Sequence, residues 1–284
     1  MNLLTQEEIE EYVQIVDSVS EVERKKIYRI LEQDRILRCR ESFIYFVSQM
    51  WPVFISGKHH QIMANAFERV AKGELKRLII NMPPRHTKSE FASYLLPAWF
   101  LGKFPHKKII QTAHTAELAV GFGRKVRNLV GSEAYGKVFD TKLSGDSKAA
   151  GRWNTEVGGD YFAIGVGGAV TGMGADLLII DDPHSEQEAK QGNPAVYDSV
   201  YEWYTSGPRQ RLQPGGAIII VMTRWSKRDL TGQIIKNSGK EGVDTWEVID
   251  FPAILPSGTP LWPGFWKKEA LEALRAEQIG RAHV

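Results

Sequence analysis

The sequence predicts an α/β fold with a central, mainly parallel sheet that is flanked by helices and preceded by a short helical arm. Two observations predict it. From about residue 75 onward, short runs of apolar and β-branched residues alternate with stretches of helical periodicity. Several of these short runs are apolar on both faces, which is typical of strands in a buried parallel sheet.

The individual elements follow from length, composition and flanking residues. Strands are predicted at Leu78–Met82, Ile109–Ala113, Tyr161–Val166, Leu177–Asp181, Ala217–Met222 and Trp246–Ile249. Helices are predicted at Lys88–Leu101, Ala116–Val130 and Ala195–Tyr204. The glycine-rich stretch from Ser144 to Gly174 indicates a hairpin with irregular loops.

Residues 1–40 are predicted to form the helical arm. Thr5 with Glu8, and Ser20 with Glu23, have the spacing of capping boxes, in which a side chain at each end satisfies a free backbone N–H group. Apolar residues recur at helical intervals after each cap. We expect the arm to be a packing element rather than a partner-binding device.

Composition excludes several classes of protein. Apolar residues make up 43% of the chain, which is enough for a core, and the net charge of only +2 limits any nucleic-acid contact to local basic patches. The single Cys39 excludes an internal disulfide framework. The sequence contains no apolar run long enough to span a bilayer and no basic leader at its start, so we expect a cytoplasmic protein without a membrane partner.

The first predicted strand leads into a candidate phosphate-binding loop. Residues 81–89 read Asn-Met-Pro-Pro-Arg-His-Thr-Lys-Ser, and a loop between a strand and a helix directs backbone N–H groups at one point. Lys88 is expected to reach the β- and γ-phosphates of ATP, and Ser89 to bind Mg²⁺. The remaining residues expected around the phosphates are Pro84, Arg85, His86 and Thr87. The standard pattern has glycine where this chain has Met82 and Thr87, and the motif alone also fits an ordinary helix start.

A second strand ends in acidic residues. The sequence Ala-Asp-Leu-Leu-Ile-Ile-Asp-Asp-Pro over residues 175–183 places Asp181 and Asp182 at the carboxyl end of a buried strand, where α/β folds bind ligands. Asp181 is expected to hold Mg²⁺, and Asp182 to orient a water molecule and accept its proton. A turn is the alternative. Thr223 follows a third apolar strand and either senses the γ-phosphate or caps the strand end.

At these residues the sequence resembles the large terminase subunit of tailed bacteriophages, the ATPase of the DNA-packaging motor. The resemblance covers roughly residues 40–275, and its carriers are the segments 81–89, 112–119, 171–183 and 222–225. It implies a P-loop NTPase fold of the ASCE type and an ATP hydrolase that needs Mg²⁺.

The resemblance also implies roles for residues of this chain. Arg85 is similar to the loop arginine that stabilises transferred charge, Asp182 to the catalytic carboxylate, and Thr223 to the motif that couples hydrolysis to DNA movement. His60-Gln61 resembles an adenine-recognition element, of which Gln61 is the candidate contact; an ordinary helix start is the alternative.

The implied partners are double-stranded DNA, a small terminase subunit and the portal of a procapsid, in the host cytoplasm. The active state is expected to be a ring of identical subunits, and the isolated chain is compatible with a monomer. The implied division is an arm (1–40), an ATPase domain (41–240) and a linker or lid segment (241–284) that leads toward a nuclease domain. We expect no DNA cleavage by this chain. Residues 279–284 resemble a translated sequencing adapter, so we expect a truncated reading frame.

Two other functional classes fit the same residues. A helicase- or AAA-like ATPase would share Lys88, Asp181 and Asp182 but would act on nucleic acid outside packaging. A non-catalytic nucleotide- or DNA-binding subunit fits the missing loop glycines.

Overall fold

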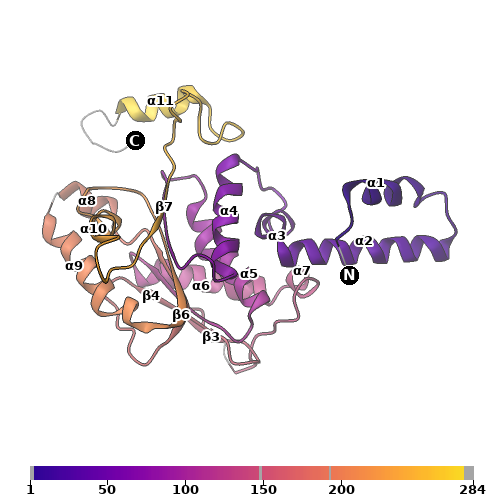
Figure 1. The fold of residues 1–284 in the computed structure, drawn as a ribbon, viewed down its shortest axis with the longest axis horizontal. Helices are drawn as coiled ribbons and strands as arrows, with labels where there is room; N and C mark the ends of the chain where they lie inside the picture. The colour runs from indigo at the N-terminus through magenta and orange to yellow at the C-terminus, as the bar shows by residue number, and fades with distance from the viewer. Residues whose placement is uncertain (1–2, 147–148, 192, 278–284) are drawn as a thin grey trace.

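The computed structural model describes residues 3–146, 149–191 and 193–277, which form a sheet covered on both faces by helices, with an arm projecting from one side (Figure 1). The sheet has seven strands in the order β3-β4-β2-β5-β6-β1-β7. Their bounds are β1 Arg77–Asn81, β2 Lys108–Ala113, β3 Arg152–Asn154, β4 Asp160–Gly165, β5 Ala175–Asp181, β6 Leu212–Met222 and β7 Glu247–Asp250. All neighbours pair in parallel except β3 with β4, so the predicted fold class is confirmed.

The helices cover the two faces of the sheet (Figure 1). On one side lie α3 (Phe43–Met50), α4 (Lys58–Ala71), α5 (Leu96–Lys103), α6 (Ala116–Val130) and the short α7 (Glu133–Gly136). On the other lie α8 (Glu186–Gln191), α9 (Pro194–Ser206) and α10 (Leu230–Asn237), with the 3₁₀ turn η2 (Pro208–Arg211) leading into β6. The C-terminal helix is α11 (Lys268–Glu277), and residues 279–284, which resemble a translated adapter, lie outside the described residues.

Each central strand contributes side chains to two hydrophobic cores, one on each face of the sheet. This explains why the strands are apolar on both faces. On β1, Leu78 and Ile80 belong to the core under α3 to α6, whereas Ile79 belongs to the core under α9 and α10. Because side chains alternate across a strand, a sheet covered on both faces needs continuous apolar runs.

The arm consists of α1 (Gln6–Ile15) and α2 (Glu21–Glu41). Both predicted capping boxes are present, at Thr5 with Glu8 and at Ser20 with Glu23. Asp34 holds the segment before α1 against α2, because it accepts the backbone N–H of Leu4 at 2.8 Å and forms an ion pair with Arg38. None of the described helices is both long and apolar enough to cross a membrane.

The helix after the candidate loop differs from the prediction. The predicted Lys88–Leu101 segment is helical, but Glu90–Leu95 forms a π-helix (η1), in which Leu96 donates to Phe91, five residues back. Pro97 follows at once; it has no N–H group to donate and its ring crowds the carbonyl four residues earlier. Single π-turns of this kind occur often at functional sites.

The boundaries of β6 also differ, since the strand begins at Leu212 rather than at Ala217. Its first half reads Leu-Gln-Pro-Gly-Gly and is largely exposed, so it lacks the apolar pattern on which the prediction rests. The hairpin predicted within 144–174 is formed by β3 and β4.

The seat of helix α6 generates a prediction. A Cβ atom at Gly123 would lie 2.4 Å from the backbone oxygen of Ala150, whereas nothing lies within 4 Å of one at Gly121. We expect Gly123→Ala to destabilise the fold by about 1–3 kcal/mol through overpacking. Gly121→Ala on the same helix is the control and should stabilise it by about 0.5–1 kcal/mol. Urea unfolding measures both, and equal effects of the two variants would contradict the packing described.

Candidate active site

The predicted site residues meet at the carboxyl ends of three neighbouring strands. The loop 82–89 follows β1, Asp181 ends β5, and Thr223 follows β6, which lies between the other two. Thr223 therefore links the loop to the acidic pair: its N–H donates to Asp182 Oδ1 at 2.7 Å and its hydroxyl donates to the Met82 carbonyl at 3.3 Å.

Lys88 and Asp182 form an ion pair in the centre of this arrangement. Lys88 Nζ lies 2.8 Å from Asp182 Oδ2, and the lysine side chain is only 7% exposed against 38% for the aspartate. Asp182 has a φ of 39°, a conformation that aspartate tolerates better than most residues. Both oxygens of the Asp182 carboxylate are therefore engaged, one by an ammonium group and one by a backbone amide.

Asp181 points into the protein toward the helix that follows the loop. Its Oδ1 accepts the Ser89 hydroxyl at 2.9 Å, and its Oδ2 accepts the Ser93 hydroxyl at 2.7 Å. Ser93 in turn accepts a hydrogen bond from the Gln111 amide at 2.9 Å. Burial raises the pKa of Asp181 above its usual range, and the neighbouring Asp182 acts in the same direction, against Lys88 and the two serine hydroxyls.

The loop itself is held in a backbone conformation that glycine favours. Arg85 and Thr87 have φ values of 63° and 70°. For L-amino acids other than glycine the left-handed region costs about 1–2 kcal/mol per residue. The Thr87 hydroxyl lies 2.7 Å from His60 Nε2 and donates to the His86 carbonyl at 2.5 Å. The position that holds glycine in the standard motif thus keeps the conformation of glycine here.

The remaining loop residues divide by burial. Pro84 and Arg85 are exposed. His86 is buried; its Nδ1 donates to the Pro84 carbonyl at 2.8 Å and its ring stacks on Trp266 with centroids 6.0 Å apart. The C-terminal segment therefore covers the back of the loop.

The candidate adenine-recognition pair is split by the structure. His60 is buried and contacts the loop, whereas Gln61 is exposed and donates to Asn65 Oδ1 at 2.9 Å on the surface of α4. Successive residues of a helix point in different directions, so one of the pair faces the loop and the other does not.

Sequence reasoning missed Ser93 and Gln111. Gln111 is a polar residue in the middle of the apolar strand β2, and such a break in pattern is a detectable signal. Ser93 lies four residues after Ser89, a spacing that places both on one helix face, but serine is common in helices and the signal is weak.

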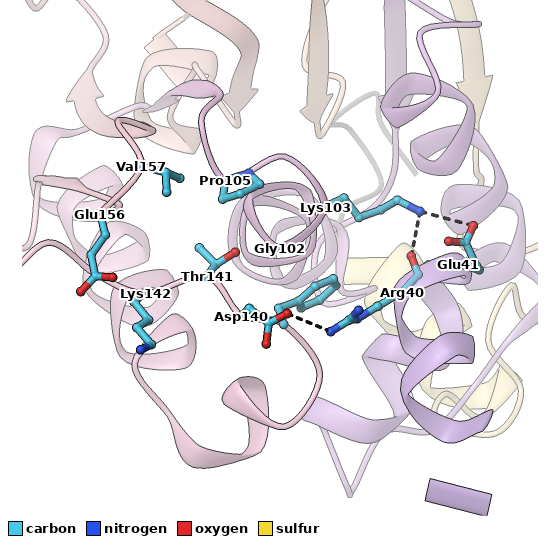
Figure 2. Close-up of a pocket in the computed structure, with 11 residues that line it drawn as sticks. Arg40, Glu41, Gly102, Lys103, Pro105, Asp140, Thr141, Lys142, Glu156 and Val157 are labelled. Atoms are coloured by element: carbon cyan, nitrogen blue, oxygen red, sulfur yellow. Dashed lines mark hydrogen bonds and ion pairs between the residues drawn. The ribbon is translucent and has the colours of Figure 1, made fainter. Parts of the chain in front are cut away.

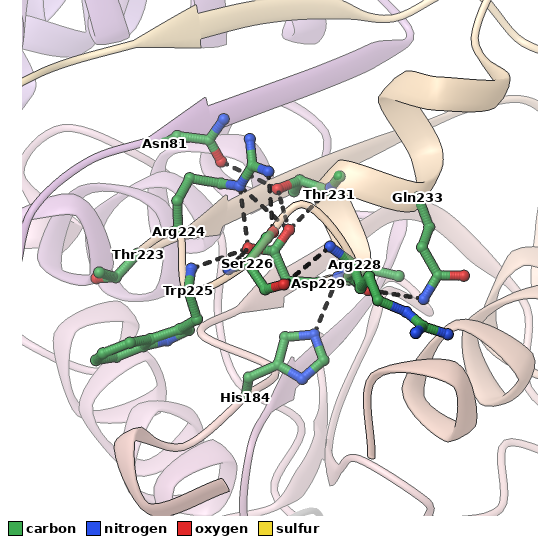
Figure 3. A network of polar contacts seen from close by, with 12 residues as sticks. Asn81, His184, Thr223, Arg224, Trp225, Ser226, Arg228, Asp229, Thr231 and Gln233 are labelled. Carbon is green, nitrogen blue, oxygen red and sulfur yellow. Dashed lines mark hydrogen bonds and ion pairs between the residues drawn. The ribbon is translucent and has the colours of Figure 1, made fainter. Parts of the chain in front are cut away.

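Asp229 was also missed. It is fully buried and accepts the backbone N–H groups of Trp225, Ser226 and Gly232 and the Arg224 guanidinium (Figure 3). As the N-cap of α10 it fixes the turn after Thr223. Thr231 extends the network to Asn81 at the end of β1. An Asp at a helix start is the signal, and it predicts a cap rather than this wider network.

The donor set of Ser89 and Asp181 fits Mg²⁺. A hydroxyl and a carboxylate are hard oxygen ligands, and Mg²⁺ is bound by one or two carboxylates with phosphates and water rather than by a protein cage. Ser89 uses its proton toward Asp181, which leaves the lone pairs of its oxygen free for a cation. Within the described part of the chain no group of three or more His, Cys, Asp or Glu residues could hold a metal ion.

A hollow of about 470 Å³ lies elsewhere, among the ends of α2 and α5 and the loops at 139–142 and 156–157 (Figure 2). Four of its charged side chains pair with protein: Lys103 contacts Glu41 and the Arg40 carbonyl, and Arg40 contacts Asp140. None of the predicted site residues lines it.

Comparison with known proteins gives similarity at the level of the fold. No protein-family model and no curated protein matches the sequence. The large terminase of bacteriophage HK97 matches with a TM-score of 0.56 at 14% identity, over 85% of this chain and 52% of that chain. An ATPase-domain mutant of the large terminase of Thermus phage P74-26 matches with a TM-score of 0.50 at 13% identity, over 82% and 91%.

The chain therefore has the fold of phage large-terminase ATPase domains, and the predicted resemblance is confirmed at that level. The chain spans about half the length of the HK97 protein.

The histidines behind the loop generate a pH prediction. His59 is buried, neither ring nitrogen has a hydrogen-bond partner among the described residues, and burial lowers its pKa to about 4. The folded state then binds fewer protons than the unfolded state, so this stability is present above pH 6.5 and is lost as the pH falls toward 4. We expect His59→Phe to remove about 2 kcal/mol of the difference in unfolding free energy between pH 7.5 and pH 5.

Urea unfolding at the two pH values measures this effect. His106→Phe, at an exposed histidine, is the matched control and should leave the pH difference as it is. A pH difference that stays the same in His59→Phe would contradict the buried, neutral state of His59.

Proposed function

We propose that this chain is a Mg²⁺-dependent ATPase. The observation that carries the proposal is the convergence of Lys88, Ser89, Asp181 and Asp182 at one sheet edge, with Lys88 on Asp182 and Ser89 on Asp181. A buried ammonium and two carboxylates after a loop that opens a helix are the groups that phosphoryl transfer from a nucleotide needs.

The Lys88–Asp182 ion pair has to open when ATP binds, so that both side chains can act on the nucleotide. The phosphates of ATP offer Lys88 more negative charge than Asp182 does, so bound ATP draws the ammonium away from the carboxylate. Asp182 Oδ1 stays fixed by the Thr223 N–H, and Oδ2 becomes available to orient a water molecule against the γ-phosphate and accept its proton. Arg85, exposed within the loop, can contact the transferred charge.

Ser89 and Asp181 would hold the metal ion, which supplies neutralisation of the phosphate charge when bound. Pro84, His86 and Thr87 shape the loop, and Thr223 joins the loop to the base through two hydrogen bonds. Gln61 is proposed to contact the adenine from the exposed side of α4.

We further propose that the ATPase drives translocation of double-stranded DNA into a procapsid. The support is the fold shared with phage large-terminase ATPase domains together with the site described. In this function the chain acts in the host cytoplasm as a ring of copies, with a small terminase subunit and the procapsid portal as partners. No DNA cleavage is assigned to the chain.

The ATPase proposal is tested by turnover. Lys88→Ala removes the phosphate contact and Asp182→Asn removes the proton acceptor, and we expect each to lower ATP turnover by about 100-fold or more. Lys72→Ala, at the exposed C-cap lysine that follows α4, is the control and should keep full turnover. Turnover in both site variants equal to that of the wild type would refute an enzymatic role.

The packaging proposal is tested separately. Double-stranded DNA should stimulate ATP turnover, and the stimulation should fall as salt rises, because contacts with phosphates release counterions. A tailed duplex should stay intact in the same reactions. Unwinding of the tailed duplex would favour a helicase-like ATPase instead.

A further inference from the structure

We propose that His60 is a positioning residue for the phosphate-binding loop. Its contact with the Thr87 hydroxyl holds Thr87 in the left-handed backbone conformation that glycine would adopt without such a contact. The part of the argument that concerns nucleotide rests on the proposed function. The part that concerns the loop rests on the contacts alone.

Three hydrogen bonds link Gly57, His60, Thr87 and His86, and we call this series the strut. The direction of each of the three is determined. The Gly57 N–H can only donate, and it donates to His60 Nδ1 at 2.9 Å. A neutral imidazole then carries its proton on Nε2, which donates to the Thr87 hydroxyl at 2.7 Å. That hydroxyl donates to the His86 carbonyl at 2.5 Å. This series of hydrogen bonds thus runs from the residue before α4 to the loop, and each donor and acceptor named in it has its partner.

The imidazole is fixed in place by aromatic rings. It stacks on Phe91 with centroids 4.8 Å apart and meets Phe54 and Trp262 edge-on at 4.8 and 5.0 Å. Burial lowers its pKa to about 3, so the ring stays neutral and keeps one donor at neutral pH. A rigid, neutral donor suits a strut.

Thr87 is the residue at which a strut has the most effect. Its φ is 70°, which β-branched residues avoid. It directly precedes Lys88, and its carbonyl accepts the N–H of Phe91 at 3.0 Å in the first turn of the helix. If Thr87 relaxed to a negative φ, the direction of the first helical N–H groups and of Lys88 would change together. His60 thereby acts on phosphate through Thr87.

The test is a double-mutant cycle between the two residues. His60→Phe keeps an aromatic ring but removes both the Nε2 donor to Thr87 and the Nδ1 acceptor of the Gly57 N–H. Thr87→Gly removes the strained backbone conformation that the contact supports. The readouts are the Kd for a fluorescent ATP analogue and, without nucleotide, the urea midpoint of unfolding. We expect His60→Phe to weaken analogue binding about tenfold when residue 87 is threonine and less than about twofold when it is glycine. The urea midpoint should fall in both backgrounds, because the acceptor of the Gly57 N–H is lost in each, and should fall further when residue 87 is threonine.

Equal losses in both backgrounds would overturn the proposal, since His60 would then act as a packing residue or a direct nucleotide contact. No loss in the threonine background would overturn it too. If no variant binds the analogue, the proposed function fails, and the urea cycle alone decides the strut: coupling between residues 60 and 87 supports it and additivity overturns it.

A second pair of variants leaves His60 untouched. Thr87→Val keeps the branched shape and removes the hydroxyl, whereas Thr87→Ser keeps the hydroxyl. We expect the valine variant to have the lower urea midpoint and the weaker analogue binding of the two. The reverse order would contradict a strut through the Thr87 hydroxyl, including in the case that His60→Phe does not fold.

Discussion

Burying Asp181 is the constraint on which the rest of the site depends. A carboxylate that is 2% exposed loses its hydration, so the surrounding structure has to replace the lost hydrogen bonds. Ser89 and Ser93 do so from one helix, and Gln111 supports Ser93 from the adjacent strand. The π-turn lies in this same stretch of helix. The polar side chains of Ser93 and Gln111 inside the α/β core are thus accounted for by the buried Asp181.

The strand order also places Asp181 and Asp182 in different surroundings. Because β6 separates β1 from β5, the turn after β6 lies between the loop and the acidic pair, where Thr223 bonds to both. The buried Asp229 holds that turn through several backbone N–H groups. Asp181 is enclosed and Asp182 is partly open to solvent, which suits the separate roles proposed for them.

Much of the fold could be predicted from sequence because apolar strands in a covered sheet leave a strong pattern. The fold class, the capping boxes and the hairpin are confirmed, while the first half of β6, which is exposed, was missed. The site was predicted as residue types at strand ends, and the roles of those residues stay predictions. Ser93 and the His60–Thr87 contact depend on a π-turn and on packing between distant segments, which local pattern does not encode.

The left-handed threonine has a consequence for how such a loop can evolve. When a histidine at residue 60 already supplies the donor, a change from glycine to threonine at residue 87 carries only part of the conformational free-energy cost of a positive φ. Without that donor, the same change carries the full cost. Once threonine is present, losing the histidine becomes harmful, so the two positions can change freely only in one order. Loops that lack the standard glycine need not be degraded sites, because a contact from a distant helix can replace what the glycine supplied.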